Sequence, residues 1–290
     1  MRHLRWKIAG HALTLVVTLL AGGFLSASLA RLAPGFQADE RELDPHLNAE
    51  SVQALRAERR EQSNLLRFYA LYMKRALHGD LGNSLSLGQP VASLLRDRAP
   101  LTLRLLGQGL TLAWLLTLGL ALTATWSHSA AYDGLNTFFS GTFLCLPAAV
   151  LALLSVLWNV SAALAIALIV FPHTYRYVRN LLAKAYSRPH IVAARARGVN
   201  DVRILFWHAL PVIAPQIIAV AGISASMAVG AAIPVETLCG LAGIGQLAWQ
   251  AAMGRDLPLL VNITVLVTLI TLLANSIAGV LGQSMRRHEA

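Results

Sequence analysis

A basic stretch from Arg176 to Pro211 is the only strongly charged segment that lies between long uncharged runs on both sides. It carries seven Lys or Arg side chains and one acid, Asp201. Basic loops beside apolar spans are retained on the cytoplasmic side of a membrane, so we expect this stretch in the cytoplasm. The small residues Ala193 and Ala194 suit a short helix that another protein can approach closely, and Gly198 can end that helix in a left-handed conformation. The chemistry predicted here is protein docking.

Two carboxylates further along the chain are the other candidate functional groups. Glu236 directly follows an uncharged run of 32 residues, so its charge needs water or a hydrogen-bonding partner. Gly243 and Gly245 then permit a tight, re-entrant backbone before Asp256. We interpret Glu236 as lining the outer mouth of a pathway through the membrane. The alternative for Glu236 is a carboxylate at the end of a span, in the headgroup region.

Motifs for catalysis or for a bound metal are missing from the sequence. The nine histidines are scattered without a His-Glu-x-x-His pattern, and Cys145 and Cys239 are two isolated residues in or beside apolar segments. The sequence also lacks a Walker A phosphate-binding loop and a Gly-x-Ser-x-Gly nucleophile motif. We therefore predict no catalytic residue, no metal site and no cofactor, and hence a protein that is not itself an enzyme.

Composition indicates a membrane protein. Of the 290 residues, 56% are hydrophobic and 13% are charged, and the mean hydropathy is +0.57. Ordinary soluble domains contain about 25% charged residues. The net charge of +10 comes largely from residues 1–7, from the central basic stretch and from Arg286 and Arg287. This distribution favours control of membrane topology over binding to nucleic acid.

The uncharged runs predict an all-α protein with six transmembrane helices. About 20 apolar residues cross the hydrocarbon core of a bilayer. We interpret Ile8 to Ala30 as a retained first span, although Ser28-Leu29-Ala30 is also compatible with cleavage of a signal peptide. The second span is expected at Leu105 to Trp126. The third and fourth spans, of about 20 residues each, are expected within Gly134 to Tyr175 and are joined near Trp158-Asn159. The fifth and sixth spans are expected at Val212 to Ile233 and at Leu257 to Met285.

The chain is expected to have three parts. Residues 1–30 form the N-terminal tail and first span. Residues 31–100, with ten basic and nine acidic side chains, form an extracytoplasmic segment with a helix ending near Leu77. Residues 101–290 form the core of five spans, with a cytoplasmic loop at 183–207. Six crossings place both termini in the cytoplasm with the basic loop.

The spacing within the basic stretch resembles the EAA loop of bacterial ABC importer permeases. That loop reads Glu-Ala-Ala, three residues, Gly, nine residues, Ile-x-Leu-Pro. Here Ala193-Ala194 is followed by Gly198 and then by His208-Ala209-Leu210-Pro211, with Val192 at the Glu position and His208 at the Ile position. The resemblance implies that the loop at 183–207 carries the coupling helix, which sits in a cleft of an ATP-binding subunit. The implied coupling helix comprises Ile191, Val192, Ala193, Ala194, Arg195, Ala196, Arg197 and Gly198.

Further segments resemble the dipeptide, oligopeptide and nickel branch of these permeases, of the B-subunit type. The signature before the second span is matched by Gly79 to Ser84, Gln89 to Val91 and Pro100 to Leu103, with Pro100 expected in the first turn of that helix. The segment between spans five and six is matched by Glu236 to Leu247 and Gly254 to Pro258, and the resemblance implies that Glu236, Gly243, Gly245 and Asp256 belong to the outer gate of the substrate pathway. Leu144 to Pro147 resembles the family's Ser-Ile-Pro within the third span, where a proline usually produces a kink. The extracytoplasmic insertion usual between spans three and four is missing.

The resemblance implies a type I ABC importer permease fold in the bacterial cytoplasmic (inner) membrane. The implied partners are a second homologous permease, two ABC ATP-binding subunits that carry ATP and Mg, an extracytoplasmic substrate-binding protein and membrane lipid, with no nucleic acid. The implied cargo is a dipeptide or oligopeptide, and the alternatives are a nickel chelate or another small solute.

Two other classes of protein were considered. An ion-coupled secondary transporter needs ionisable residues inside its spans, yet only His11 and His173 lie in or near the apolar runs, apart from Arg104 at the end of one. A membrane-embedded hydrolase needs a nucleophile or metal motif, and the sequence has neither.

Overall fold

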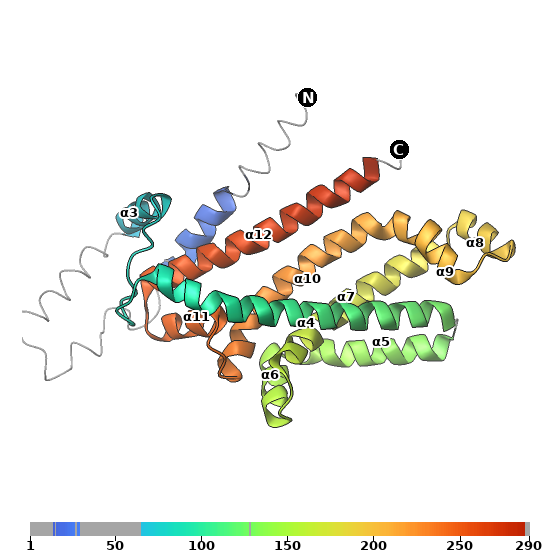
Figure 1. Cartoon of the computed structure of the whole chain (residues 1–290), viewed down its shortest axis with the longest axis horizontal. Coiled ribbons are helices and arrows are strands. Elements are labelled where there is room, and N and C mark those ends of the chain that lie inside the picture. The colour runs from blue at the N-terminus through green and yellow to red at the C-terminus, as the bar shows by residue number, and fades with distance from the viewer. Residues whose placement is uncertain (1–13, 15, 27, 30–64, 128, 288–290) are drawn as a thin grey trace, which may run out of the picture. The chain divides into compact units, whose positions relative to one another are not determined.

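The computed structural model describes residues 14, 16–26, 28–29, 65–127 and 129–287. It divides the chain into two compact units: residues 1–99 with 247–269, and residues 100–246 with 270–290. Three helices run from one unit into the other: α4 (Val91–Ser127), α11 (Ile244–Met253) and α12 (Leu257–Arg287). The order of the elements is shown in Figure 1.

At least three helical segments can cross a membrane by length and composition. They are α4, the segment Asp201–Leu238 and α12 as far as Met285, and they correspond to the predicted second, fifth and sixth spans. The bent pair of α5 (Ala130–Cys145) and α6 (Ala148–Leu157) adds a fourth if it counts as one span. The predicted first span is represented by an apolar helix, Val16–Ser26, and residues 8–13, 15, 27 and 30 of the prediction lie outside the described residues.

The predicted fourth span corresponds to α7 (Ala162–Tyr186), which is less apolar than the other spans. Its second half contains Arg176, Arg179 and Lys184. The uncharged part, Ala162 to Tyr175, extends only ~21 Å at 1.5 Å per residue, against a hydrocarbon core of about 30 Å. The helix is therefore present, but α7 alone does not satisfy the length and composition of a membrane span.

The predicted third span is not one continuous helix. It is divided into α5 and α6, which meet at an angle of 98°. Leu146 is extended, with φ −81° and ψ 125°, because a residue before a proline is disfavoured in the helical region. Pro147 also has no N–H to donate to the helical hydrogen bonds. The expected proline kink is therefore a full break. The turn predicted near Trp158-Asn159 is confirmed, and Asn159 has a φ of 52°.

The start of α4 also differs from the prediction. We expected Pro100 in the first turn of this helix, whereas the helix begins at Val91 and Pro100 lies inside it. The intervening sequence, Val91 to Ala99, contains Ala, Leu and Arg, which favour helix strongly enough to extend α4 toward the N-terminus. The two units nonetheless divide at Pro100.

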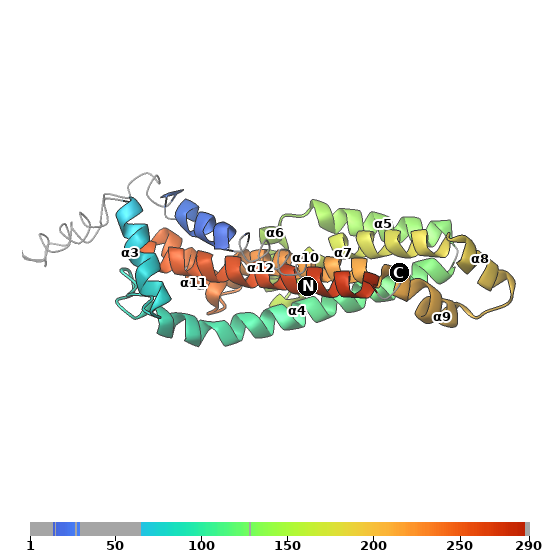
Figure 2. The same ribbon diagram turned by 90° about the horizontal axis from the view of Figure 1, so that it is seen from above.

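The second unit is built around α7. This helix packs against α5, α6 and α10 (Leu210–Leu238), and Figure 2 shows α5 alongside α7. Its buried apolar residues recur mainly at intervals of three and four, as expected for one face of a helix. They are Ala163, Ala165, Ile166, Ala167, Val170, Phe171, Tyr175, Val178, Leu182, Ala185 and Tyr186.

Small residues bring α10 close to α12 within the second unit. A β-carbon at Gly222 would lie 2.8 Å from the β-carbon of Ala278, and a β-carbon at Gly282 would lie 3.0 Å from the carbonyl oxygen of Pro215. In lipid the hydrophobic effect does not drive helices together, so their association depends on close van der Waals packing. Small residues permit that packing because they let the two backbones approach. These glycines are therefore used for packing inside the chain.

The first unit holds α3 (Leu65–Leu77) and the loop after it against α12. The Tyr72 hydroxyl donates to Oδ1 of Asn262 at 3.0 Å, and Nδ2 of Asn262 donates to the carbonyl of Leu81 at 3.0 Å. Burial, with a smaller contribution from Tyr69, raises the pKa of Tyr72 to about 12, so the hydroxyl remains a donor at neutral pH. The predicted helix end near Leu77 is confirmed, and Gly79 follows with a φ of 80°.

Candidate functional site

The implied coupling helix is a separate helix, α8 (Pro189–Ala196). Pro189 occupies its first turn, where a missing N–H costs nothing, and the helix stops two residues before Gly198. Gly198 has a φ of 79°, and its N–H donates to the carbonyl of Arg195 at 2.9 Å. The local prediction of a short helix ended by a left-handed glycine is confirmed.

Most of α8 is accessible. Ile191 is its buried residue, at 1% exposure, and anchors the helix to the core of the second unit. Val192 is 54% exposed, and Ala193 and Ala196 are also exposed. Small exposed side chains leave room for another protein to approach the helix backbone.

The chain returns from α8 to α10 through two short helices. α9 (Asp201–Ile204) starts at Asn200, whose side chain accepts from the N–H of Val202 at 3.3 Å. The π-helix η2 (Leu205–Ala209) follows and contains His208. Single π-turns of this kind are often found at functional sites.

Glu236 is completely buried near the end of α10. Its Oε2 accepts from the backbone N–H groups of Gly245 at 2.6 Å and Gln246 at 3.2 Å. Its Oε1 accepts from the hydroxyl of Thr102 at 2.7 Å, and that hydroxyl oxygen accepts from the N–H of Ile244 at 2.8 Å. A buried carboxylate requires such donors, because desolvation without them is costly. In the described chain, the partners of Glu236 are protein groups that fix the loop before α11.

The two glycines of the predicted gate are needed for this arrangement. A β-carbon at Gly243 would collide with the carboxylate of Glu236, and one at Gly245 would lie 2.7 Å from the carbonyl oxygen of Ala232. The structure thus brings Glu236, Gly243 and Gly245 together. A role for them in a transport pathway stays a prediction.

Asp256, the fourth gate residue, belongs to the first unit and is also fully buried. Its Oδ2 accepts from the hydroxyl of Ser84 at 2.5 Å and from both the N–H and the hydroxyl of Ser86 at 2.9 Å. Its Oδ1 accepts from the N–H of Leu259 at 3.0 Å, in the first turn of α12. Asp256 therefore caps α12 and attaches the loop after α3.

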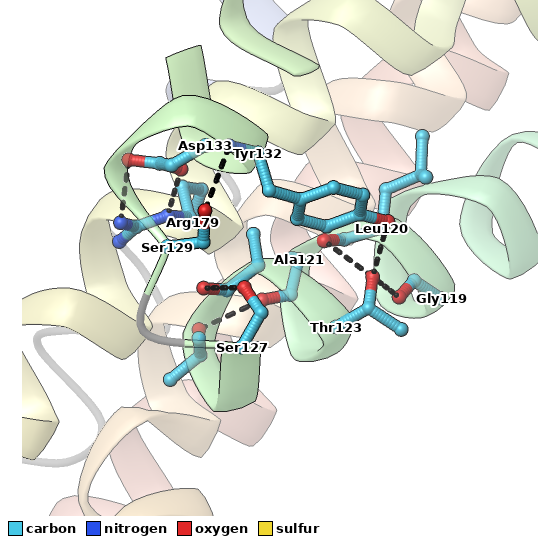
Figure 3. Close-up of polar contacts among 11 residues, drawn as sticks. Gly119, Leu120, Ala121, Thr123, Ser127, Ser129, Tyr132, Asp133 and Arg179 are labelled. Atoms are coloured by element: carbon cyan, nitrogen blue, oxygen red, sulfur yellow. Dashed lines mark hydrogen bonds and ion pairs between the residues drawn. The ribbon is translucent and has the colours of Figure 1, made fainter. Parts of the chain in front are cut away.

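An ion pair that we did not predict joins α5 to α7 (Figure 3). Nε and Nη2 of Arg179 donate to the two carboxylate oxygens of Asp133 at 2.7 and 2.8 Å. Beside it, the Ser129 side chain caps α5 by accepting from the N–H of Tyr132 at 3.3 Å. The sequence contained a signal for this pair. Asp133 precedes and Arg179 follows the uncharged run 134–175, and the turn at Trp158-Asn159 brings the two ends of that run together.

The described part of the second unit includes two cavities with different linings. A polar one of about 350 Å³ lies next to the ion pair, and an apolar one of about 440 Å³ lies between α4 and α10. Trp114 lines the apolar cavity and donates from its indole to the hydroxyl of Ser224 at 3.1 Å. No group of three or more His, Cys, Asp or Glu side chains placed to hold a metal occurs among the residues that the structure describes.

Comparison with known proteins gives the family. The profile of the family described as "Binding-protein-dependent transport system inner membrane component" matches residues 110–287, which is more than half of the chain. The chain belongs to this family. It is thus a permease of a binding-protein-dependent ABC importer, a multi-pass protein of the inner membrane, as its resemblance had implied. Permeases of this kind function with a partner ATPase and a substrate-binding protein, and they are typically non-catalytic.

Individual relatives agree with this assignment. The chain is 26% identical over 284 residues to the nickel import system permease protein NikB of Staphylococcus aureus strain bovine RF122 / ET3-1, a match that covers 92% of this chain and 86% of the relative. The protein of the same name from strain MRSA252 gives the same values. Among solved structures, a permease chain of the inward-facing MetNI methionine ABC transporter matches with a TM-score of 0.58 at 19% identity, covering 67% of this chain and 97% of that chain. At this identity the match supports the fold alone.

Proposed function

We propose that this permease forms one half of the translocation pathway of an ATP-driven importer and receives the energy of ATP hydrolysis through α8. The supporting observation is α8 itself, a short and largely exposed helix in the basic stretch, followed by a left-handed Gly198. In this proposal a second homologous permease completes the pathway, two ATP-binding subunits bind ATP and Mg, and the extracytoplasmic receptor delivers the cargo. The two states of the ATPase must contact α8 differently, because equal contacts shift no equilibrium.

The proposal includes six spans with both termini in the cytoplasm and residues 31–100 outside. It also assigns Glu236, Gly243, Gly245 and Asp256 to the outer gate. The hydrogen bonds of Glu236 and Asp256 hold the backbone segments that precede α11 and α4, so their contribution to a gate is to fix these segments.

A nickel complex is the first candidate for the cargo, because the NikB relatives carry nickel import in their names and match 92% of this chain. A dipeptide or oligopeptide is the second candidate. It is favoured by the segments Gly79 to Ser84 and Pro100 to Leu103, which resemble the signature of the peptide branch.

The energy-coupling role can be tested with the substitution Ala194→Trp, which places a bulky side chain on α8. The chain would be purified with its partner permease, ATP-binding subunits and receptor, and reconstituted in proteoliposomes. We expect wild-type vesicles to accumulate cargo only with ATP, and Ala194→Trp vesicles to hydrolyse ATP with uptake lowered by at least about tenfold. Uptake that proceeds normally in the Ala194→Trp vesicles would contradict the role of α8.

The cargo can be tested in the same vesicles with radioactive nickel and a radiolabelled dipeptide offered separately. ATP-dependent accumulation of nickel alone supports the first candidate, and accumulation of the dipeptide alone supports the second. Accumulation of either one without ATP or without the ATP-binding subunits would instead indicate a secondary transporter and contradict the importer.

A further inference from the structure

A buried tyrosine at the end of α7 joins α8 to the rest of the second unit. Tyr186 is the last residue of α7 and is 9% exposed. The guanidinium carbon of Arg195, on α8, lies 5.4 Å from the centre of the Tyr186 ring, which is a cation–π contact. Nη2 of Arg195 also donates to Oδ1 of Asp201 at 2.8 Å, at the start of α9.

The hydroxyl of Tyr186 makes the remaining connections. It accepts from the indole N–H of Trp126 at 3.3 Å, in the last turn of α4, and it donates to the carbonyl oxygen of Asp201 at 3.5 Å. One side chain thus contacts groups from α4, α8 and α9 while it belongs to α7. We define Tyr186, Arg195, Asp201 and Trp126 as the tyrosine clamp.

We propose that Tyr186 is a positioning residue that transmits the movement of α8 to α4 and α7. This inference rests on the proposed function of α8. In α8, Ile191 is the buried residue, so the described links from this helix to the spans include that apolar contact, the chain connections and the clamp. Because Tyr186 is buried and Arg195 is 40% exposed at its side chain, the clamp reaches from the accessible surface of α8 into the packed core.

The clamp is suited to movement in both directions. A rigid link must hold when α8 is pushed and when it is pulled, and the apolar contact of Ile191 is attractive but has no preferred direction. The ring contact and the ion pair of Arg195 add attraction, and the tyrosine hydroxyl adds directional hydrogen bonds. The polar cavity borders the clamp, because Arg195 and Tyr186 both line it.

The test uses the complete transporter in proteoliposomes, with whichever of radioactive nickel and the radiolabelled dipeptide the wild type accumulates. Three variants are compared: Tyr186→Leu, Tyr186→Phe and Tyr177→Leu. Tyr177 is on the same helix but 58% exposed, so it is the matched control. Two quantities are measured, the rate of ATP hydrolysis and the amount of cargo imported per ATP.

We expect Tyr186→Leu to lower the cargo imported per ATP by roughly fivefold, the factor that corresponds to one cation–π contact, while ATP hydrolysis and the yield of intact complex are retained. Tyr186→Phe keeps the ring and should retain most of the coupling, and Tyr177→Leu should leave both quantities unchanged. Adding Arg195→Ala to Tyr186→Leu should produce a smaller further loss than Arg195→Ala produces in the wild type, because the ring contact is already gone and only the ion pair with Asp201 remains to be lost.

Three results would overturn the proposal. The first is an unchanged ratio of cargo to ATP in Tyr186→Leu. The second is an equal decrease in uptake and hydrolysis with a lower yield of complex, which is the behaviour of a merely structural residue. The third is the same loss in Tyr177→Leu as in Tyr186→Leu. A wild-type complex that imports nothing in an ATP-dependent manner would instead contradict the proposed function, so the two failures are distinguishable.

Discussion

At the scale of single residues, the two buried carboxylates show how this chain uses charge. Glu236 and Asp256 both follow apolar or glycine-rich sequence, and each is surrounded by hydroxyl and backbone N–H donors. A carboxylate that accepts several hydrogen bonds can remain buried, whereas the loss of its donors leaves an uncompensated charge. Both residues therefore hold loops in place by hydrogen bonding.

Gly243 gives a prediction at this scale. Gly243→Ala would drive a methyl group into the carboxylate of Glu236, and we expect it to lower the free energy of unfolding by about 1–3 kcal/mol, the usual cost of overpacking. Gly230 on α10 is the control, because a β-carbon there meets no atom within 4 Å. Gly230→Ala should leave the thermal unfolding temperature in detergent unchanged or slightly raised. Equal unfolding temperatures for the two variants would contradict the close contact at Gly243.

At the scale of elements, the residues at helix ends determine where the chain turns. Pro147 separates α5 from α6, and Gly198 separates α8 from the return to α9. Both effects come from the backbone: proline removes an N–H donor and restricts the residue before it, and glycine adopts a positive φ without steric cost. Such positions can be tested by substitutions that change only backbone preference.

Gly198 is the clearest case, because no atom lies within 4 Å of the place that its β-carbon would occupy. Any effect of Gly198→Ala must therefore come from the left-handed backbone, which costs an alanine about 1–2 kcal/mol. We expect this variant to weaken the capture of purified ATP-binding subunits by the immobilised permease roughly fivefold to thirtyfold. Gly198→Asn should retain most of the binding, since asparagine tolerates this conformation. Gly119→Ala, in an uncrowded position of α4, is the control, and a similar loss there would exclude the backbone explanation.

At the scale of the whole molecule, the membrane topology is the main feature to test. The basic stretch around α8 is predicted in the cytoplasm, and the loop after α3 is predicted outside. Loops rich in Lys and Arg stay in the cytoplasm. Because each span crosses the membrane once, successive loops then alternate between the two sides. A single pair of positions on the two predicted sides is sufficient to test the scheme.

Cysteine labelling provides that test. In a chain with Cys145 and Cys239 replaced by alanine, Gln89→Cys and His190→Cys would be introduced one at a time at exposed positions. We expect a membrane-impermeant maleimide to label position 89 in intact spheroplasts and position 190 only after permeabilisation. Labelling of both positions from the same side would contradict the predicted topology.

The sequence alone determined the features that depend on local chemistry. The uncharged runs predicted at least three helices that can span a membrane, because desolvation of charge is costly in lipid. The spacing around Gly198 predicted α8, because glycine is suited to a left-handed helix end. Only the tertiary structure decided which side chains meet across long separations, such as Glu236 with Thr102, Asp133 with Arg179 and Arg195 with Tyr186. It also decided that Pro147 breaks its span completely. These outcomes depend on how helices pack against one another, and helix packing is a property of many residues at once that no local spacing specifies.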